Sequence, residues 1–348
     1  MREYLTCAPL LVFGLSCFGQ SSPQSVPQDP QAIFAAAEPF YDFNSAELKP
    51  WHLKATYQLY NQSGKPAENG TFEYWRSSPK VRRSSWTRPS ADRTDWHSSD
   101  GTHSYRATGE KLSYFERLLP SLLFAPLPSA HDLDSGKTRI ELHERLSNGT
   151  RFPCVTIIAL NGKGLSHLSQ SEDPIYCFDP QMPDLRASYT FGEVITDFNN
   201  IAKFQGRFLA REIEVSIGGR KVFSAAVENV TGLIASDPAL APDPDAKQLR
   251  VENLCDTAGT MISHLIKKQA PVYPLDAIQR RQQGTVLIQV TIGTDGRVRD
   301  PEVAFTPSPT LAAAAVDAVS HWEYEPTTVN GVPVETDTMI RIIFLIGD

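Results

Sequence analysis

Residues 285–296 read TVLIQVTIGTDG, and their alternation of β-branched and polar residues predicts a strand followed by a tight turn. Four apolar residues share one face of that strand, which we expect to lie in a core: Val286, Ile288, Val290 and Ile292. The pair Asp295-Gly296 supplies the positive φ angles that a tight hairpin needs. Residues 297–305 should therefore return antiparallel to the first strand.

A helix and a last strand should complete this unit. Ser308 offers an N-cap, and Pro309 is suited to the first helical turn. The helix should carry one apolar stripe, formed by Leu311, Ala315, Ala318 and Trp322. Glu325-Pro326 should end the helix, and Asn330-Gly331 should turn the chain into a strand over 338–345. We therefore expect a small α+β unit in which a three-stranded antiparallel sheet is covered by helices on one side.

The order of residues over 257–348 resembles the TonB C-terminal domain family. The matching features are Pro271-x-Tyr273-Pro274, Ala277, Gly284-x-Val286-x-Ile288-x-Val290, Asp295-Gly296-x-Val298, Ala313-Ala314, Trp322-x-Tyr324-x-Pro326, Gly331-x-Pro333-Val334 and a C-terminal apolar strand. In that family the domain lies in the periplasm and serves transmembrane transport, because it binds the short TonB box of outer-membrane transporters as an extra strand. Such β-augmentation satisfies the unpaired N–H and C=O groups of an edge strand.

The resemblance implies a partner-binding site on the last strand and on the segment that precedes the first helix. Its residues are Gln269, Pro271, Tyr273, Pro274, Thr338, Ile340, Ile342 and Phe344. The implied partner is an outer-membrane TonB-dependent transporter or another envelope protein. The sequence departs from the family at Ala270, where members often carry a Gln, and Gln269 lies one residue earlier.

The last strand also permits a second interpretation. It is too apolar for a strand with one face in water, as shown by Met339, Ile340, Ile342, Ile343 and Leu345. A helix, a second copy of the domain or a partner peptide could cover the other face. The alternative to peptide binding is therefore a strand that serves as core and as a homodimer interface.

The length of 348 residues allows two domains, each with its own core. A net charge of −7 and a pI near 5.7 give no reason to expect a nucleic-acid partner. Residues 1–19 are predicted to be an export signal, so we expect a periplasmic protein. Cys17 could instead be lipidated, which would attach the protein to a membrane. No other stretch is apolar enough to span a bilayer, so we expect the chain to bind a partner rather than to transduce energy.

Residues 20–47 are expected to form a flexible spacer, and residues 48–234 a β-rich domain. The expected strands are 53–60, 70–76, 81–87, 93–97, 102–108, 138–142, 153–160, 175–179, 185–189, 194–204, 208–217 and 221–230. These short alternating runs favour a meandering antiparallel sheet, arranged as a half-barrel or a sandwich. A Pro-rich linker over 235–256 should lead into the C-terminal unit, with a helix within 249–270.

The segment Gly70-Thr71-Phe72-x-Tyr74-x-Arg76-x-x-Pro79, followed by Ser99-Asp100-Gly101-Thr102, resembles the LolA-type lipoprotein-carrier fold. In that family a curved, incompletely closed sheet wraps an apolar hollow that takes up acyl chains. The resemblance implies that aromatic residues line such a hollow, and the candidates are Phe72, Tyr74, Trp86, Trp96 and Tyr105. The same residues could equally fill the solid core of a β-sandwich. The apolar stretch 114–128 contains prolines that argue against one continuous helix, and it should form a lid or a buried connector.

Cys154 and Cys177 lie in two apolar runs that neighbouring antiparallel strands would bring together. We expect a disulfide in an exported protein, with two buried thiols as the alternative. The eight histidines are scattered, and neither a metal-ligand spacing nor a nucleophile motif is present in the sequence. We therefore expect a binding protein without metal or cofactor rather than an enzyme. The alternative function is a lipid or lipoprotein carrier whose C-terminal domain acts as a tether.

Overall fold

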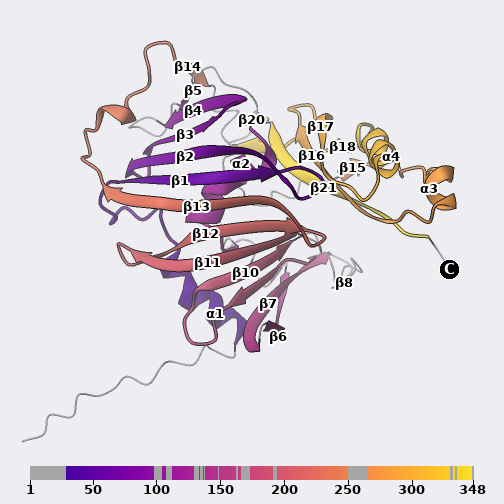
Figure 1. The fold of residues 1–348 in the computed structure, drawn as a ribbon, viewed down its shortest axis with the longest axis horizontal. Helices are drawn as coiled ribbons and strands as arrows, with labels where there is room; N and C mark the ends of the chain where they lie inside the picture. The colour runs from indigo at the N-terminus through magenta and orange to yellow at the C-terminus, as the bar shows by residue number, and fades with distance from the viewer. Residues whose placement is uncertain are drawn as a thin grey trace, which may run out of the picture.

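The computed structural model describes residues 29–97, 104–106, 112–128, 133, 136, 138–147, 149–161, 164–165, 173–190, 194–249, 265–329, 332–333 and 335–346. They form a large antiparallel sheet, followed in the chain by a small three-stranded sheet (Figure 1). The large sheet contains β1 Trp51–Tyr60, β2 Pro66–Ser78, β3 Val81–Arg88, β4 Ala91–His97, β5 Ser104–Arg106, β6 Thr138–Ser147, β7 Thr150–Asn161, β8 Gly164–Leu165, β9 Ile175–Phe178, β10 Leu185–Thr190, β11 Val194–Phe204, β12 Arg207–Ile217, β13 Arg220–Gly232 and β14 Lys247–Leu249. Each strand predicted between residues 53 and 230 is present, although 102–108 is described only at 104–106.

The large sheet joins two meanders through the pairing of β1 with β13. Its strand order is β14-β5-β4-β3-β2-β1-β13-β12-β11-β10-β9-β7-β6, with β8 beside β7. The path of paired strands ends at β14 and at β6, so this path does not close on itself. The alternation of Leu53, Ala55 and Tyr57, all buried, with more exposed residues shows that one face of β1 carries the core.

Two helices cover that face, which we call the inner face. Helix α1 (Pro30–Ala37) contributes Ile33 and Phe34 to the core, and α2 (Tyr114–Phe124) contributes Leu119 and Leu123. Three of the predicted aromatic residues fill the same core: Phe72, Tyr74 and Trp86. Trp96 faces the opposite side, where its indole N–H donates to the carbonyl of Ala239 at 3.3 Å. The Tyr105 side chain lies outside the described residues.

The expectation that prolines prevent a continuous helix over 114–128 is wrong for its first part. Pro120 lies inside α2, which is continuous from Tyr114 to Phe124. A proline at this position leaves the carbonyl four residues earlier, that of Glu116, without its helical donor. The Trp86 indole N–H donates to that carbonyl at 3.2 Å. The sheet therefore supplies the hydrogen bond that the helix lacks, which sequence periodicity could not reveal.

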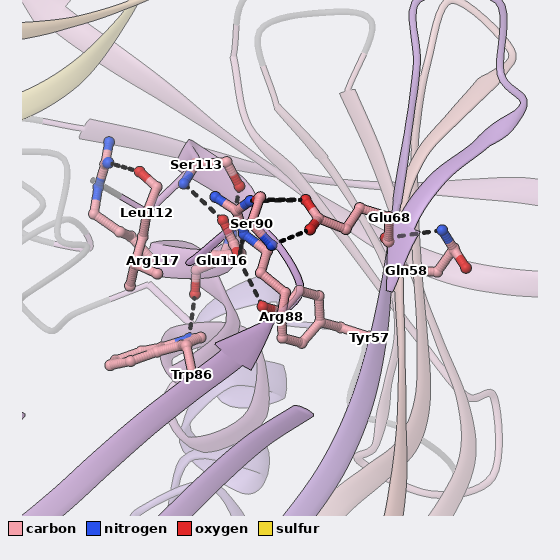
Figure 2. A network of polar contacts seen from close by, with 10 residues as sticks. All are labelled: Tyr57, Gln58, Glu68, Trp86, Arg88, Ser90, Leu112, Ser113, Glu116 and Arg117. Carbon is pink, nitrogen blue, oxygen red and sulfur yellow. Dashed lines mark hydrogen bonds and ion pairs between the residues drawn. The ribbon is translucent and has the colours of Figure 1, made fainter. Parts of the chain in front are cut away.

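A buried polar network fixes the N-terminus of α2 to the sheet (Figure 2). The carboxylate of Glu116 accepts hydrogen bonds from the Tyr57 hydroxyl at 2.7 Å and from Nε of Arg88 at 2.9 Å. It also accepts from the backbone N–H of Ser113, closing a capping box. Arg88 continues the network to Glu68 at 2.7 Å. Burial, followed by the bond to Glu116, raises the pKa of Tyr57, so its hydroxyl stays protonated and donates.

Part of the expected spacer is folded. Residues 30–40 form α1 and the 3₁₀ turn η1 (Glu38–Phe40), and Tyr41 and Phe43 are buried in the core. Residues 20–28 lie outside the described residues. The expected linker is also attached to the large sheet, because Arg83 and Trp96 donate to the carbonyl of Ala239 in η2 (Pro238–Leu240) and β14 pairs with β5.

The C-terminal unit has the predicted architecture. Its sheet has the order β17-β16-β21, formed by β16 Gly284–Ile292, β17 Val298–Phe305 and β21 Thr336–Phe344. Gly296, with φ of +76°, makes the predicted hairpin turn between β16 and β17. The predicted core face of β16 is fully buried, and it packs with Leu311 and Ala315 of helix α4 (Pro309–Val319) and with Ala277 of α3 (Leu275–Gln279).

Two details of this unit differ from the prediction. Helix α4 ends at Val319, so Trp322 lies beyond it, although its side chain is buried in the same core. The predicted helix within 249–270 is wrong where it is described, because residues Leu265–Lys267 form strand β15 and pair with β18 (Glu323–Tyr324). Residues 250–264 lie outside the described residues. A second short hairpin pairs β19 (Thr328–Val329) with β20 (Val332–Pro333), around the predicted turn at 330–331.

The second face of the small sheet packs against the large one. Leu287, Phe305 and Met339 belong to the same core cluster as the inner face of the large sheet. The Arg220 guanidinium lies 4.3 Å from the centre of the Phe305 ring and donates to the carbonyl of Thr306 at 3.4 Å. Figure 1 accordingly shows the small sheet beside the end of the large sheet, where β13 begins. The two sheets therefore share one apolar core.

Substitution of Glu116 tests the anchoring of α2. Glu116→Ala should lower the free energy of unfolding by about 3–5 kcal/mol, because it leaves the buried Arg88 and Tyr57 groups without their acceptor. Glu144→Ala, which removes an exposed ion pair with Arg151, is the matched control and should change stability little. Urea unfolding monitored by circular dichroism measures both. Equal stabilities of the two variants would show that the network does not hold α2.

Candidate functional site

The candidate site is the outer edge of β21. This strand pairs antiparallel with β16 from Gly284↔Phe344 to Ile292↔Thr336 without a register shift, and it is the last strand of the sheet. Its N–H and C=O groups that point away from β16 have no described strand to bind. The edge is nine residues long and rich in apolar side chains. It therefore has the length and regularity that an added strand requires.

The other edges of the two sheets are protected. On β17, the pairing with β16 is interrupted at two places, Asp300 has a φ of +46°, and Pro301 has no N–H to donate. On the large sheet, β14 is only three residues long, and β6 carries exposed charged residues such as Arg139 and Glu141. These features prevent edge pairing. Among the sheet edges in the described part of the chain, β21 is the long, regular and apolar one.

The predicted binding residues of β21 face inward. Ile340, Ile342 and Phe344 are 5%, 5% and 2% exposed and pack under α4 and α3 in the small core. Thr338 occupies the same face, opposite Val290. The side chains of Ile340, Ile342 and Phe344 are therefore not available to a partner, whereas Thr338 is half-buried. Any binding at the three apolar residues uses the main chain.

The predicted binding residues before α3 have structural contacts. The Gln269 carbonyl accepts a hydrogen bond from the Trp322 indole at 2.8 Å. The Tyr273 hydroxyl donates to the Gln282 carbonyl at 2.6 Å, and its ring meets Phe344 edge-on at 5.2 Å. Pro274 is the N-cap residue of α3, and Pro271 is half-buried before it. This segment therefore connects α3 to the C-terminal end of β21.

That end of β21 is surrounded by exposed apolar side chains. Ile343 is 37% exposed and Leu345 70%, and Val272 and Leu275 in the neighbouring segment are each 77% exposed. The contact between Tyr273 and Phe344 places both segments at the same end of the unit. Sequence reasoning missed Val272 and Leu275. The sequence offered one signal for them: Val272 and Leu275 flank the Tyr273-Pro274 pair and belong to no apolar periodic pattern.

Both faces of the apolar strand β21 are covered by other parts of this chain. Met339 is buried in the core shared with the large sheet, and the opposite face is buried by α4. A second copy of the chain is not needed to cover either face of β21 near Met339. A partner of β21 would therefore pair with the main chain along its outer edge rather than pack on one of its faces.

Cys154 and Cys177 lie directly opposite each other in β7 and β9, with Cα atoms 4.0 Å apart, and their sulfur atoms are bonded. Phe152 and Tyr189 pack around the pair. The disulfide connects the two strands at the β6 side of the large sheet.

In the described part of the chain, we find no group of three or more His, Cys, Asp or Glu residues that could hold a metal ion. A search of the same residues also finds no helix long and apolar enough to cross a membrane. The predicted export signal and Cys17 lie outside the described residues.

The edge strand, its helix-covered face and the Tyr-Pro segment agree with one comparison. Residues 269–346 match the family model of the Gram-negative bacterial TonB protein C-terminal. The family predicted from the sequence is thereby confirmed for this unit, which we call the TonB-like domain. A search of curated proteins gives no significant match.

The solved structures with a loose likeness to the chain include those of three bacterial proteins. A DUF1329 family protein from Desulfovibrio piger is 14% identical, with a TM-score of 0.35, and the match covers 61% of this chain and 100% of that one. A LolA superfamily protein from Nitrosomonas europaea is 8% identical, with a TM-score of 0.38, covering 62% and 98%. A domain from Vibrio parahaemolyticus, described as an outer membrane lipoprotein-sorting protein, is 9% identical, with a TM-score of 0.34, covering 60% and 92%. At these TM-scores we draw no functional conclusion from the likeness.

Removal of the disulfide should destabilise the β6 side of the large sheet. Cys154→Ser combined with Cys177→Ser should cost about 2–4 kcal/mol in unfolding free energy, because the unfolded chain loses a cross-link. A reductant should lower the melting temperature of the wild type and leave that of the double variant unchanged. Differential scanning calorimetry provides the measurement, and equal sensitivity of both proteins to the reductant would contradict the prediction.

Proposed function

We propose that the chain is a non-enzymatic binding protein of the cell envelope whose TonB-like domain docks an extended peptide of a partner by strand addition to β21. The observation that carries this proposal is the unbroken edge of β21, which has no further strand beside it in the described part of the chain. The match of residues 269–346 to the TonB C-terminal family supports it, because that family suggests an envelope protein. The proposed partner is an outer-membrane transporter or another envelope protein, and the proposed location is the periplasm.

The energetics of strand addition favour a weak and reversible complex. Main-chain groups at the edge of a sheet can bind water when no partner is present, so an empty edge costs little. A peptide replaces that water with a ladder of hydrogen bonds, each worth about 0.5–1.5 kcal/mol net. Selectivity would come from the apolar side chains at the end of the strand, such as Ile343 and Leu345. We expect partners with apolar residues at alternate positions.

Proline substitution on β21 tests the proposal. Adjacent residues of an antiparallel strand direct their backbone groups to opposite sides, so one of Ile342 and Ile343 faces β16 and the other faces the open edge. Proline at the outward position should weaken binding of a TonB-box peptide from an outer-membrane transporter at least about tenfold, with little loss of stability. Proline at the other position should instead destabilise the domain. Fluorescence anisotropy with a labelled peptide measures binding, and urea unfolding measures stability.

A peptide of the same length with two adjacent prolines at its centre is the matched control, because in either register one of them faces β21 without an N–H to donate, so this peptide should bind at least about tenfold more weakly. The proposal fails if Ile342→Pro and Ile343→Pro both fold and both bind the unmodified peptide as the wild type does. If the peptide does not bind and the protein is a dimer that proline on β21 converts to a monomer, the edge serves a second copy of this chain instead.

A second candidate function is that of a lipid or lipoprotein carrier. The observation that favours it is the aromatic inner face of the large sheet, which α1 and α2 cover. Mass spectrometry of the purified protein for co-purified lipid tests this candidate. Lipid without peptide binding would favour a carrier in which the TonB-like domain is a tether.

A further inference from the structure

Four side chains that carry hydrogen-bond donors lie side by side across the inner face of the large sheet. Backbone pairing aligns Trp51 of β1 with Arg76 of β2, Arg76 with Arg82 of β3, and Arg82 with His97 of β4. We call these residues the donor row. Directly paired residues of neighbouring strands point to the same face. Two guanidinium groups are therefore placed opposite each other, an arrangement that like-charge repulsion disfavours.

Arg76 is buried without an anionic partner. Its side chain is 1% exposed, and its one hydrogen bond in the described structure goes from Nη2 to the Ser45 carbonyl at 2.7 Å. Nε and Nη1 of Arg76 have no acceptor among the described residues, and neither has Nε1 of Trp51 beside it. Three donors are therefore unsatisfied at one place. Buried charges in proteins are normally paired, because desolvation of an unpaired ion costs several kcal/mol.

The described carboxylates near Arg76 and Arg82 form no ion pair with either guanidinium. Asp95, two residues before His97 on β4, is bound by Nε and Nη2 of Arg93 at 2.9 and 2.7 Å. Burial lowers the pKa of Arg76, Tyr74 and Asp42 oppose this, and Arg82 lowers it further. Asp42 is exposed and forms no described ion pair with Arg76. Arg82 donates to the Pro79 carbonyl at 3.2 Å and likewise has no described carboxylate partner. Within the described part of the chain, Arg76 and Arg82 therefore form no ion pair with a carboxylate.

An apolar environment adjoins the unsatisfied donors. The Trp51 ring contacts Phe43, Phe124 and Phe204, with centroids 6.0, 5.2 and 6.0 Å away. The ring of Tyr74, the next inward residue on β2, is tilted against that of Phe124, with centroids 4.6 Å apart. The donors thus lie at the border of an aromatic cluster. A ligand that satisfies both parts has an acidic head and an apolar tail.

We propose that Arg76, Arg82 and Trp51 bind the anionic headgroup of an amphiphile, a carboxylate or a phosphate, whose apolar part contacts the aromatic residues around Trp51. This inference does not depend on strand addition at β21. It rests on the second candidate function, lipid binding, and specifies the chemistry of the headgroup that the large sheet would select.

Three probes separate the parts of the proposal: palmitate, hexadecanol and inorganic phosphate. Palmitate and hexadecanol have the same alkyl chain and differ in the acidic head, whereas phosphate has charge without a tail. We expect the full-length protein to bind palmitate at least about tenfold more tightly than either of the others, because charge-assisted hydrogen bonds to a buried guanidinium discriminate at that level. Isothermal titration calorimetry measures the three affinities.

Adjacent residues of β3 provide matched variants. Arg82→Met removes a cation from the donor row, whereas Arg83→Met removes a cation from the opposite face, where Arg83 lies over Trp75 at 4.3 Å. Arg82→Met and Arg76→Met should each weaken palmitate binding at least about tenfold, and Arg83→Met should change it less than about twofold. Arg76→Met should also leave the melting temperature of the ligand-free protein unchanged or raised, because it removes an unpaired buried charge.

Several outcomes would overturn the inference. Equal affinities for palmitate and hexadecanol would show that the head is not recognised, and phosphate binding as tight as that of palmitate would show that the tail is not. Unchanged palmitate affinity in Arg82→Met would remove the donor row from the site, even if Arg76→Met failed to fold. If none of the three probes binds, both the headgroup site and lipid binding are rejected. If palmitate and hexadecanol bind equally well, the headgroup site alone is rejected.

Discussion

The structure depends on one strand that is apolar on both faces. On β16, Val286, Ile288 and Val290 pack under α4, while Leu287 on the other face packs into the core of the large sheet. A strand of a small antiparallel sheet usually keeps one face in water. Because β16 keeps neither, the TonB-like domain is stable in this arrangement only with the large sheet against it. Gln289, also on the covered face, is 2% exposed and its amide nitrogen has no described acceptor, which is a cost of this burial.

This packing decides what the TonB-like domain can offer a partner. One face of its sheet is covered by helices and the other by the large sheet, and β17 is interrupted by Pro301 and by irregular pairing. The outer edge of β21 is what remains. The large sheet therefore does more than carry the domain, because it also covers one face of the small sheet, so that the proposed partner would reach β21 only along its outer edge. The attachment of the 235–249 segment to β3, β4 and β5 strengthens this restriction.

Much of the fold was predictable because local patterns determined it. The alternation of Val286, Ile288 and Val290, the Asp295-Gly296 turn and the proline at the start of α4 each specify a conformation with few alternatives. The errors share a different cause. Helix α2 tolerates Pro120 because Trp86, distant in the sequence, satisfies the freed carbonyl, and Leu265–Lys267 is a strand because β18 is beside it. Such tertiary contacts override local propensity and leave no periodic signal.

The candidate site was predictable as an edge but not in its details. Family resemblance pointed to β21, which is the last described strand of the small sheet, yet it could not show that Ile342 and Phe344 face inward, since this depends on which face α4 covers. The exposed Val272 and Leu275 gave no periodic pattern, because they belong to a connection. The donor row could not be predicted from the sequence, for a different reason. Arg76 and Arg82 look like ordinary surface residues in the sequence, and only the register of three strands places them beside Trp51.

The two proposed sites differ in how much they lower the stability of the fold when no ligand or partner is bound. On β21 the unpaired groups are main-chain groups at an edge, where water can bind them, so an empty edge is tolerated and a partner gains little per hydrogen bond. Arg76 is buried, so water cannot solvate it freely, and an empty donor row lowers the stability of the fold. A ligand of the donor row would therefore stabilise the protein strongly and leave slowly, whereas a peptide on β21 would exchange readily. Because the two sheets share a core through Leu287 and Met339, a ligand that stabilises the large sheet also strengthens the support on which the β21 edge depends.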